Sequence, residues 1–133
     1  MQMHKIVLSI INKTDYKIKP RVFREILTKA KKFLKLDSFD ELSVAIISQK
    51  EMQNINRVYR GLDEPTDVLS FDYGEILLCP EYMIKKYQLN KKGVQQKMQE
   101  LFAHGVCHIA GLNHNTKQAE QKMKRLEQKI LTW

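Results

Sequence analysis

Three histidines near the C-terminal end of the chain have the spacing of a metal site. His104, His108 and His114 form the pattern H-x-x-x-H-x-x-G-x-x-H, and they are three of the four histidines in the chain. On a helix, residues four apart lie about 40° from one another around the axis and one turn apart, so both imidazoles can reach one ion. Gly111 can end the helix through a left-handed conformation and return His114 toward the same point. The pattern therefore predicts one divalent metal ion held by these three imidazoles.

Three imidazole ligands are typical of a catalytic zinc site, because they leave a fourth position open for water or substrate. Cys107 lies in the same segment, but its apolar neighbours favour a packed thiol over a fourth ligand. His4 is isolated near the N-terminus, so we interpret it as a histidine without a metal. We expect one Zn²⁺ per chain, with other metals that prefer imidazole as the alternative.

The same spacing occurs in the metzincin proteases, whose motif is H-E-x-x-H-x-x-G-x-x-H. Gly105 occupies the position of the glutamate. In a metalloprotease that glutamate is the general base, and glycine has no proton acceptor. A metalloprotease is therefore a disfavoured alternative. A phosphodiester substrate is favoured, because its hydrolysis can proceed with a metal hydroxide, Lewis-acid help and an added cation.

The hydrophobic pattern predicts strands and helices around these residues. Short apolar or β-branched runs favour strands, and apolar residues at helical spacing favour helices. Gly74 lies between two short strand-like runs, so we expect a tight antiparallel hairpin there, with Pro80 ending the second strand. The expected strands cover residues 6–11, 42–47, 68–71 and 76–79, and the expected helices cover residues 20–34, 51–59, 95–109 and 117–131.

Length and composition indicate one globular domain, residues 1–133, with 43% apolar and 29% charged residues. No apolar stretch approaches the ~20 residues of a membrane span, and no signal-peptide core is present. The two cysteines, Cys79 and Cys107, form no C-x-x-C pair, so no disulfide is expected. We expect an unprocessed cytoplasmic protein.

The chain is basic, with a formal net charge of +8. Such a surplus attracts polyanions, which suits a nucleic-acid partner better than a membrane. The alternative is that the many lysines reflect surface composition alone.

A second motif precedes the histidines. Residues 56–71 read N-R-V-Y-R-G-L-D-E-P-T-D-V-L-S-F. Together with the histidine cluster and the strand start Gly74-Glu75-Ile76, this segment resembles the YbeY family of bacterial metal-dependent endoribonucleases, whose motifs are Y-R-x-x-D-x-P-T-D-V-L-S-F and H-G-x-L-H-L-x-G-Y-D-H. The resemblance implies an α+β fold: a single compact domain with a small mixed four-stranded sheet packed with helices, and a metal site at the end of a long helix.

The resemblance also implies a function. It predicts a zinc-dependent endoribonuclease, specific for single-stranded RNA, that acts in ribosomal RNA maturation at the 3′ end of the small-subunit RNA and in ribosome quality control. The implied partners are single-stranded RNA, ribosomal RNA and the ribosome or its proteins. The alternative is a non-catalytic RNA-binding factor of ribosome assembly that keeps zinc for stability.

Two residues of the second motif have separate expected roles. Arg60 matches the family's basic residue near the cleft, and a guanidinium can pair with two phosphate oxygens at once, so Arg60 is our candidate catalytic residue. An ion pair of Arg60 with Asp63 or Glu64 is the alternative. Asp67 is expected to brace the loop by hydrogen bonds rather than to transfer protons.

The motifs also contain departures from the family pattern. Asn113 stands where the family usually has aspartate, and an amide cannot act as a base at neutral pH. A carboxylate base beside the third histidine is therefore not expected. The other departures are Leu62 for lysine, Glu75 for aspartate, Cys107 for leucine, Leu112 for tyrosine, and a short hairpin around Asp72.

Overall fold

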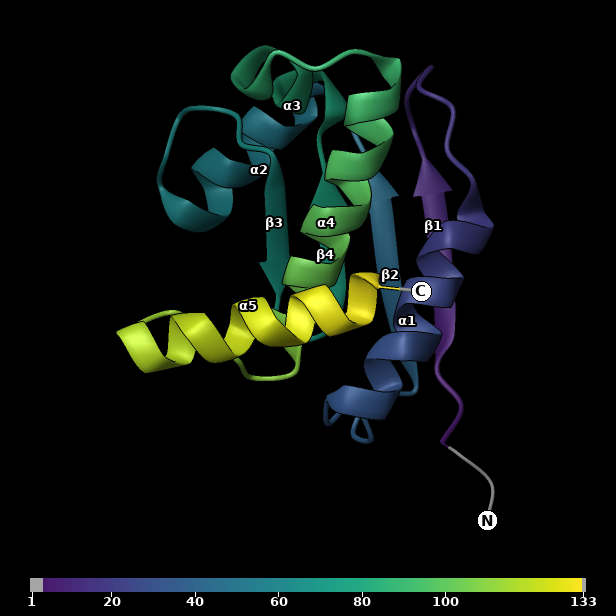
Figure 1. The fold of residues 1–133 in the computed structure, drawn as a ribbon. Coiled ribbons are helices and arrows are strands. Elements are labelled where there is room, and N and C mark those ends of the chain that lie inside the picture. Colours follow the sequence, from purple (N-terminus) through teal and green to yellow (C-terminus); the bar gives the residue numbers. More distant parts are fainter. Residues whose placement is uncertain (1–3, 133) are drawn as a thin grey trace.

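A computed structural model describes residues 4–132, and its four strands form one sheet in the order β1-β2-β4-β3 (Figure 1). Strands β1 (Val7–Asn12), β2 (Glu41–Ile46) and β4 (Glu75–Leu78) are parallel to one another. Strand β3 (Val68–Phe71) pairs antiparallel with β4 at one edge. The small mixed sheet that the family resemblance implied is confirmed.

The sheet is covered on both faces. Ile76 and Leu78 of β4 pack into the larger core, whereas Leu77 and the adjoining Cys79 pack into a smaller core. Successive side chains of a strand point to opposite faces, so the two cores lie on opposite sides of the sheet. This arrangement explains why the central strands are nearly continuous apolar runs rather than alternating ones.

Helices supply both layers. Phe23 of α1 and Phe102 of α4 make an edge-to-face contact in the larger core, with ring centroids 4.9 Å apart. Helix α5 crosses the C-terminal half of α4 on the same side of the sheet (Figure 1). Met52 of α2 packs into the smaller core. The helices are α1 (Pro20–Phe33), α2 (Gln49–Arg60), α3 (Pro80–Tyr87), α4 (Lys91–Ile109) and α5 (Lys117–Leu131).

Most predicted elements are confirmed to within two residues at each end, and two helices differ by more. Helix α3 was not predicted, because Pro80 was interpreted only as the end of a strand, although proline also suits the first position of a helix. Helix α4 begins at Lys91 rather than residue 95, because the Asn90 side chain caps it by accepting from the Gly93 N–H at 2.8 Å. The predicted hairpin is present, and Gly74 has a φ of 114°.

The sequence predicted neither a membrane-spanning helix nor a disulfide. Within residues 4–132, no helix is both long and apolar enough to cross a bilayer. Cys79 and Cys107 are buried free thiols, so these two residues form no disulfide.

Candidate metal centre

Two of the three histidines project from one side of α4. His104 and His108 are one turn apart, and their ring centroids are separated by 4.5 Å. Their Nε2 atoms lie 3.0 Å apart. Two imidazoles four residues apart on this helix therefore converge on one point, as their spacing predicted.

The third histidine returns to the same point after the helix ends. Gly111 has a φ of 96°, and its N–H donates to the His108 carbonyl at 2.9 Å. The turn places the His114 ring 5.3 Å from the His108 ring and 6.1 Å from the His104 ring, between centroids. One nitrogen of each histidine lies within 4.8 Å of the others, so the three could hold a metal ion. The predicted role of Gly111 in ending the helix is confirmed.

The outer nitrogens of the two helical histidines are both engaged. Nδ1 of His104 lies 2.5 Å from Oε1 of Glu127, and Nδ1 of His108 lies 3.1 Å from the Leu112 carbonyl oxygen. Since both partners accept hydrogen bonds, each Nδ1 carries the proton and each Nε2 keeps a lone pair. This arrangement is the one that metal-ligating histidines have in proteins, so the residues present fit a bound ion.

Glu127 is a site residue that the sequence reasoning missed. It lies on α5, 23 positions from its partner His104. One signal was available: Glu127 is four residues after Met123 and three before Ile130, both of which are buried, so it is a carboxylate on the apolar face of an amphipathic helix. A carboxylate in that position requires a polar partner.

The surroundings of His108 favour its neutral form. Burial, followed by the neighbouring His104 and His114 imidazoles, lowers the pKa of His108 below its ordinary value. A neutral imidazole is the form that binds metals. The electrostatics of the cluster therefore agree with its geometry.

A pocket of about 650 Å³ opens beside the histidines. Arg60, the last residue of α2, lines this pocket together with the three histidines. Helix α2 ends there because Gly61 takes a left-handed conformation with a φ of 71°. The structure thus brings the candidate Arg60 and the histidine cluster to one cavity. The remaining lining residues are Tyr59, residues 68–72 and Ile109.

Arg60 does not form the alternative ion pair with Asp63 or Glu64. Nε of Arg57, not the Arg60 guanidinium, lies 3.9 Å from Oδ1 of Asp63. Asn56, which is buried, donates from Nδ2 to the Glu64 carbonyl at 2.8 Å. Gln53 also donates from Nε2 to Oδ1 of Asp63 at 3.1 Å, so the loop after α2 is held by Gln53, Asn56 and Arg57.

The predicted bracing role of Asp67 is confirmed. Its carboxylate accepts from the Val68 N–H at 2.8 Å and from the Tyr87 hydroxyl at 2.6 Å, and it lies 3.6 Å from the Lys86 ammonium. These contacts fix the start of β3 against α3.

Comparison with known proteins agrees with this site. A family model described as Endoribonuclease YbeY matches residues 9–133. The chain belongs to the YbeY endoribonuclease family.

Relatives named Endoribonuclease YbeY come from several organisms. The Thermodesulfovibrio yellowstonii protein is 33% identical over 79% of this chain and 76% of its own length. The Bdellovibrio bacteriovorus protein is 37% identical over 69% of this chain and 66% of its own length. The Spiroplasma citri protein is 30% identical over 92% of this chain and 89% of its own length. Among solved structures, the solution structure of TM1509 from Thermotoga maritima matches with a TM-score of 0.59 and 25% identity, over 93% of this chain and 89% of that one.

The glycine after the first histidine of the YbeY-like motif has a packing role here. A Cβ built on Gly105 would lie 3.1 Å from Cδ1 of Ile76 in β4, which is tighter than most Cβ contacts in proteins. Position 105 therefore faces the sheet and not the pocket. The glutamate of a metalloprotease would have to enter the core at this point, which gives a structural reason to disfavour the protease alternative.

The departures from the YbeY motif leave the histidine geometry intact. Leu112 contributes its backbone carbonyl to His108, so a change of its side chain leaves that contact in place. The Asn113 side chain accepts from the Asn115 N–H at 3.0 Å and so stabilises the turn. Glu75 accepts from the Tyr73 hydroxyl at 3.0 Å within the short hairpin.

Cys107 and His4 are not part of the cluster. Cys107 is fully buried in the larger core, as predicted, and burial raises the pKa of its thiol to about 12. Nε2 of His4 lies 2.7 Å from the Phe39 carbonyl oxygen, outside the histidine group. The three-histidine set is therefore the one that the sequence predicted.

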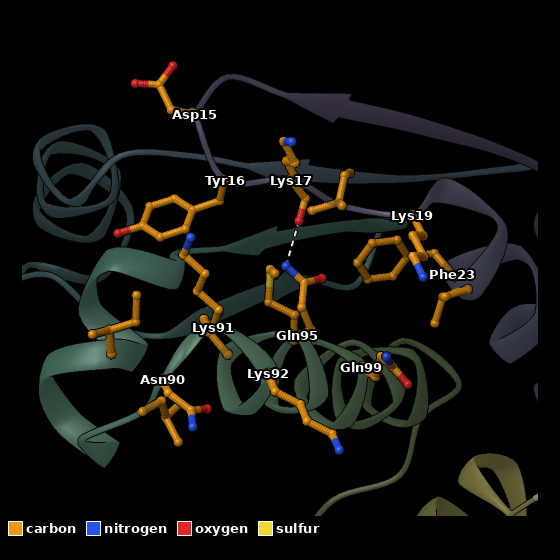
Figure 2. A pocket seen from close by; sticks show the side chains of 16 residues that line it. Asp15, Tyr16, Lys17, Lys19, Phe23, Asn90, Lys91, Lys92, Gln95 and Gln99 are labelled. Carbon is orange, nitrogen blue, oxygen red and sulfur yellow. Dashed lines mark hydrogen bonds between the residues drawn. The ribbon is translucent and has the colours of Figure 1, made fainter.

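A larger hollow of about 1400 Å³ lies elsewhere, between the segment before α1 and the start of α4 (Figure 2). Gln95 crosses it to donate to the Lys17 carbonyl at 2.5 Å. Its lining holds no histidine or cysteine and one acidic residue, Asp15. This hollow therefore lacks a histidine group like that of His104, His108 and His114.

Proposed function

We propose that the chain is a metal-dependent endoribonuclease that cleaves single-stranded RNA, with one Zn²⁺ held by His104, His108 and His114. The observation that carries this proposal is the 3.0 Å separation of the Nε2 atoms of His104 and His108. The other ring nitrogen of each, Nδ1, already faces a hydrogen-bond acceptor. Membership of the endoribonuclease family and the charge of +8 support RNA as the substrate.

Residues in and beside the pocket have separate parts in this proposal. A divalent ion held by His104, His108 and His114 would supply positive charge near a phosphate and would lower the pKa of a bound water molecule. Glu127 holds the proton of His104 on Nδ1, and the Leu112 carbonyl does the same for His108. Arg60 lines the same cavity, and its planar guanidinium offsets the charge that develops on the phosphate.

We further propose that residues 1–133 act as a single domain in the cytoplasm, in the maturation of ribosomal RNA at the 3′ end of the small-subunit RNA. Ribosome quality control, with the ribosome or its proteins as partners, is the second part of this proposal. Both parts rest on the family resemblance of residues 56–114 and on family membership.

The test compares metal content and cleavage in the same samples. We expect the purified chain to carry one metal ion and to cut a labelled single-stranded RNA but not the matched duplex. His108→Ala and chelation should abolish both metal binding and cleavage, and added Zn²⁺ should restore cleavage after chelation only. Cleavage that persists in the metal-free chain would contradict the proposal. If the chain instead unfolds on chelation and never cuts RNA, the ion is structural and the non-catalytic alternative holds.

A further inference from the structure

Exposed aromatic rings adjoin the histidine pocket. Tyr59 is 69% exposed and Tyr73 is 66% exposed. Between them lies Phe71, which is partly buried and packs against the smaller core. Tyr59 and Phe71 also line the pocket that contains Arg60 and the histidines. Single exposed apolar residues are ordinary, but a contiguous group at the rim of a functional pocket marks a binding surface.

The three rings form a continuous row drawn from separate parts of the fold. The Phe71 ring, at the end of β3, lies 5.5 Å from the Tyr59 ring of α2, at an interplanar angle of 72°. It lies 5.5 Å from the Tyr73 ring, at an interplanar angle of 24°, so these two rings are stacked. Tyr73 belongs to the turn between β3 and β4, so the row runs from the helix end to the hairpin.

Two of the three rings, Phe71 and Tyr73, have further contacts that hold them in place before any ligand arrives. Phe71 is anchored by its packing against the core, and the Tyr73 hydroxyl donates to Oε1 of Glu75 at 3.0 Å. Rigid aromatic side chains lose little conformational freedom on binding, so they are efficient contact groups.

The local charges favour a base over a phosphate at these rings. Asp72 and Glu75 are the neighbours of Tyr73, and Asp72 also lines the pocket. Their carboxylates repel phosphate, whereas Arg60 attracts it from within the same cavity. A nucleotide whose phosphate lies at Arg60 and the histidines would thus direct its base toward the aromatic row.

We infer that Tyr59, Phe71 and Tyr73 form a stacking platform for unpaired nucleobases next to the phosphate that is cut. This inference rests on the proposed function and adds the base-binding part of the site. A base inside a duplex already stacks on its neighbours and cannot lie against a side-chain ring without leaving the stack. The platform therefore selects single-stranded RNA by its exposed base faces and with little sequence preference.

The test measures binding rather than cleavage, with the full-length chain in its metal-loaded form. The probes are a phosphorothioate single-stranded RNA, shown to stay intact on a gel, and the same oligomer with abasic residues. A third probe carries 2-aminopurine, whose fluorescence is quenched on stacking. We expect Tyr73→Ala to weaken binding of the base-bearing RNA between about five-fold and a hundred-fold, to leave abasic RNA unaffected, and to reduce quenching. Tyr59→Ala should act in the same direction.

Two control variants make the test specific. Tyr73→Phe keeps the ring and should retain the preference for base-bearing RNA. Val58→Ala removes an apolar side chain that is 66% exposed, next to Tyr59 in the sequence, and should also retain it. Thermal melting checks that each variant is folded.

The outcomes separate this inference from the proposed function. If Tyr59→Ala and Tyr73→Ala bind base-bearing and abasic RNA as the wild type does while all of them cut RNA, the platform is wrong and the nuclease stands. If base preference is lost in the variants but the wild type cuts no RNA, the platform stands and the nuclease is wrong. A change of oligomeric state in Tyr73→Ala with unchanged RNA binding would assign the rings to a protein interface and overturn the inference.

Discussion

The Tyr87 hydroxyl donates to Oδ2 of Asp67 at 2.6 Å, and this contact joins helix α3 to the start of strand β3. Asp67 is 7% exposed, so its carboxylate depends on protein partners in place of water. Strand β3 lines the metal pocket, so this pair positions one wall of the site.

Removal of the Tyr87 hydroxyl should destabilise the fold. We expect Tyr87→Phe to lower the free energy of unfolding by about 1–2 kcal/mol, because a part-buried hydrogen bond to a carboxylate is lost while the ring still packs. Urea unfolding followed by circular dichroism measures the change. Tyr59→Phe, which removes an exposed hydroxyl, should be neutral. Equal stability of Tyr87→Phe and the wild type would show that the contact contributes nothing net.

The same pair predicts a pH dependence with a defined sign. Burial, followed by the hydrogen bond to Asp67, raises the pKa of Tyr87 above its ordinary 10.0. The folded chain therefore binds this proton more tightly than the unfolded chain, so the stabilisation is complete below the ordinary pKa and is lost as pH rises through the raised one. The stability difference between the wild type and Tyr87→Phe should shrink above about pH 10. A difference that grows with pH would contradict this assignment.

Glu127 should set the affinity of the histidine cluster for metal. We expect Glu127→Gln to weaken Zn²⁺ binding about 10–100-fold, because the amide no longer holds the His104 proton on Nδ1 as strongly. Competition with a chelating dye measures the affinity. Glu120→Gln, which alters an exposed carboxylate paired with Lys124 on the same helix, is the matched control. Unchanged affinity in Glu127→Gln would limit Glu127 to helix packing.

Arg60 should act on the rate of cleavage more than on RNA affinity. Arg60→Lys keeps the charge but replaces a planar fork by a point donor, so we expect the rate at saturating RNA to fall about 10²–10³-fold. Arg57→Lys, four residues before the C-cap of the same helix, is the control, because Arg57 faces Asp63. A wild-type rate in Arg60→Lys would make Arg60 a binding or structural residue.

The packing of Gly105 against Ile76 predicts that a protease-like residue cannot be installed there. Gly105→Glu must place a long, charged side chain where Cδ1 of Ile76 already lies, so we expect a loss of about 3 kcal/mol or more in the free energy of unfolding. Lys92→Glu, at an exposed position of the same helix, is the control for the charge change. A Gly105→Glu chain that melts like the wild type would disprove the packing argument.

Cys79 and Cys107 should not react with thiol reagents in the folded protein. Burial, followed by the nearby Glu127 charge, raises the pKa of Cys107 to about 12, and burial also raises the pKa of Cys79. Thiolates react and thiols do not, so a disulfide reagent at about pH 8 should label neither cysteine until denaturant is added. Labelling of Cys107 in the native chain would show that the larger core opens at the metal centre.

The sequence predicted the features that depend on neighbouring residues. The spacing of His104 and His108 and the stop at Gly111 are local, so the histidine cluster could be predicted before the fold was known. The last helix was also predicted at residues 117–131, which are its observed bounds.

Features that depend on tertiary contacts could not be predicted in this way. Glu127 meets His104 only because α5 crosses α4, and nothing within the histidine motif specifies that crossing. The choice of Arg57 rather than Arg60 as the partner of Asp63 depends on how the chain turns after α2. Helix α3 is only eight residues long, so its pattern was too short to distinguish from a strand end followed by a loop.

The position of Glu127 on the final helix links metal binding to the docking of the C-terminus. Because the carboxylate that orients His104 is delivered by α5, undocking of this helix must weaken the hold on the ion, and a bound ion must in turn hold the helix in place by the same free energy. The amide protons of α5 should therefore exchange with solvent more slowly when metal is added. Metal affinity and the docking of the last helix are thus coupled, and the histidines should reach their full affinity only when α5 is packed against α4.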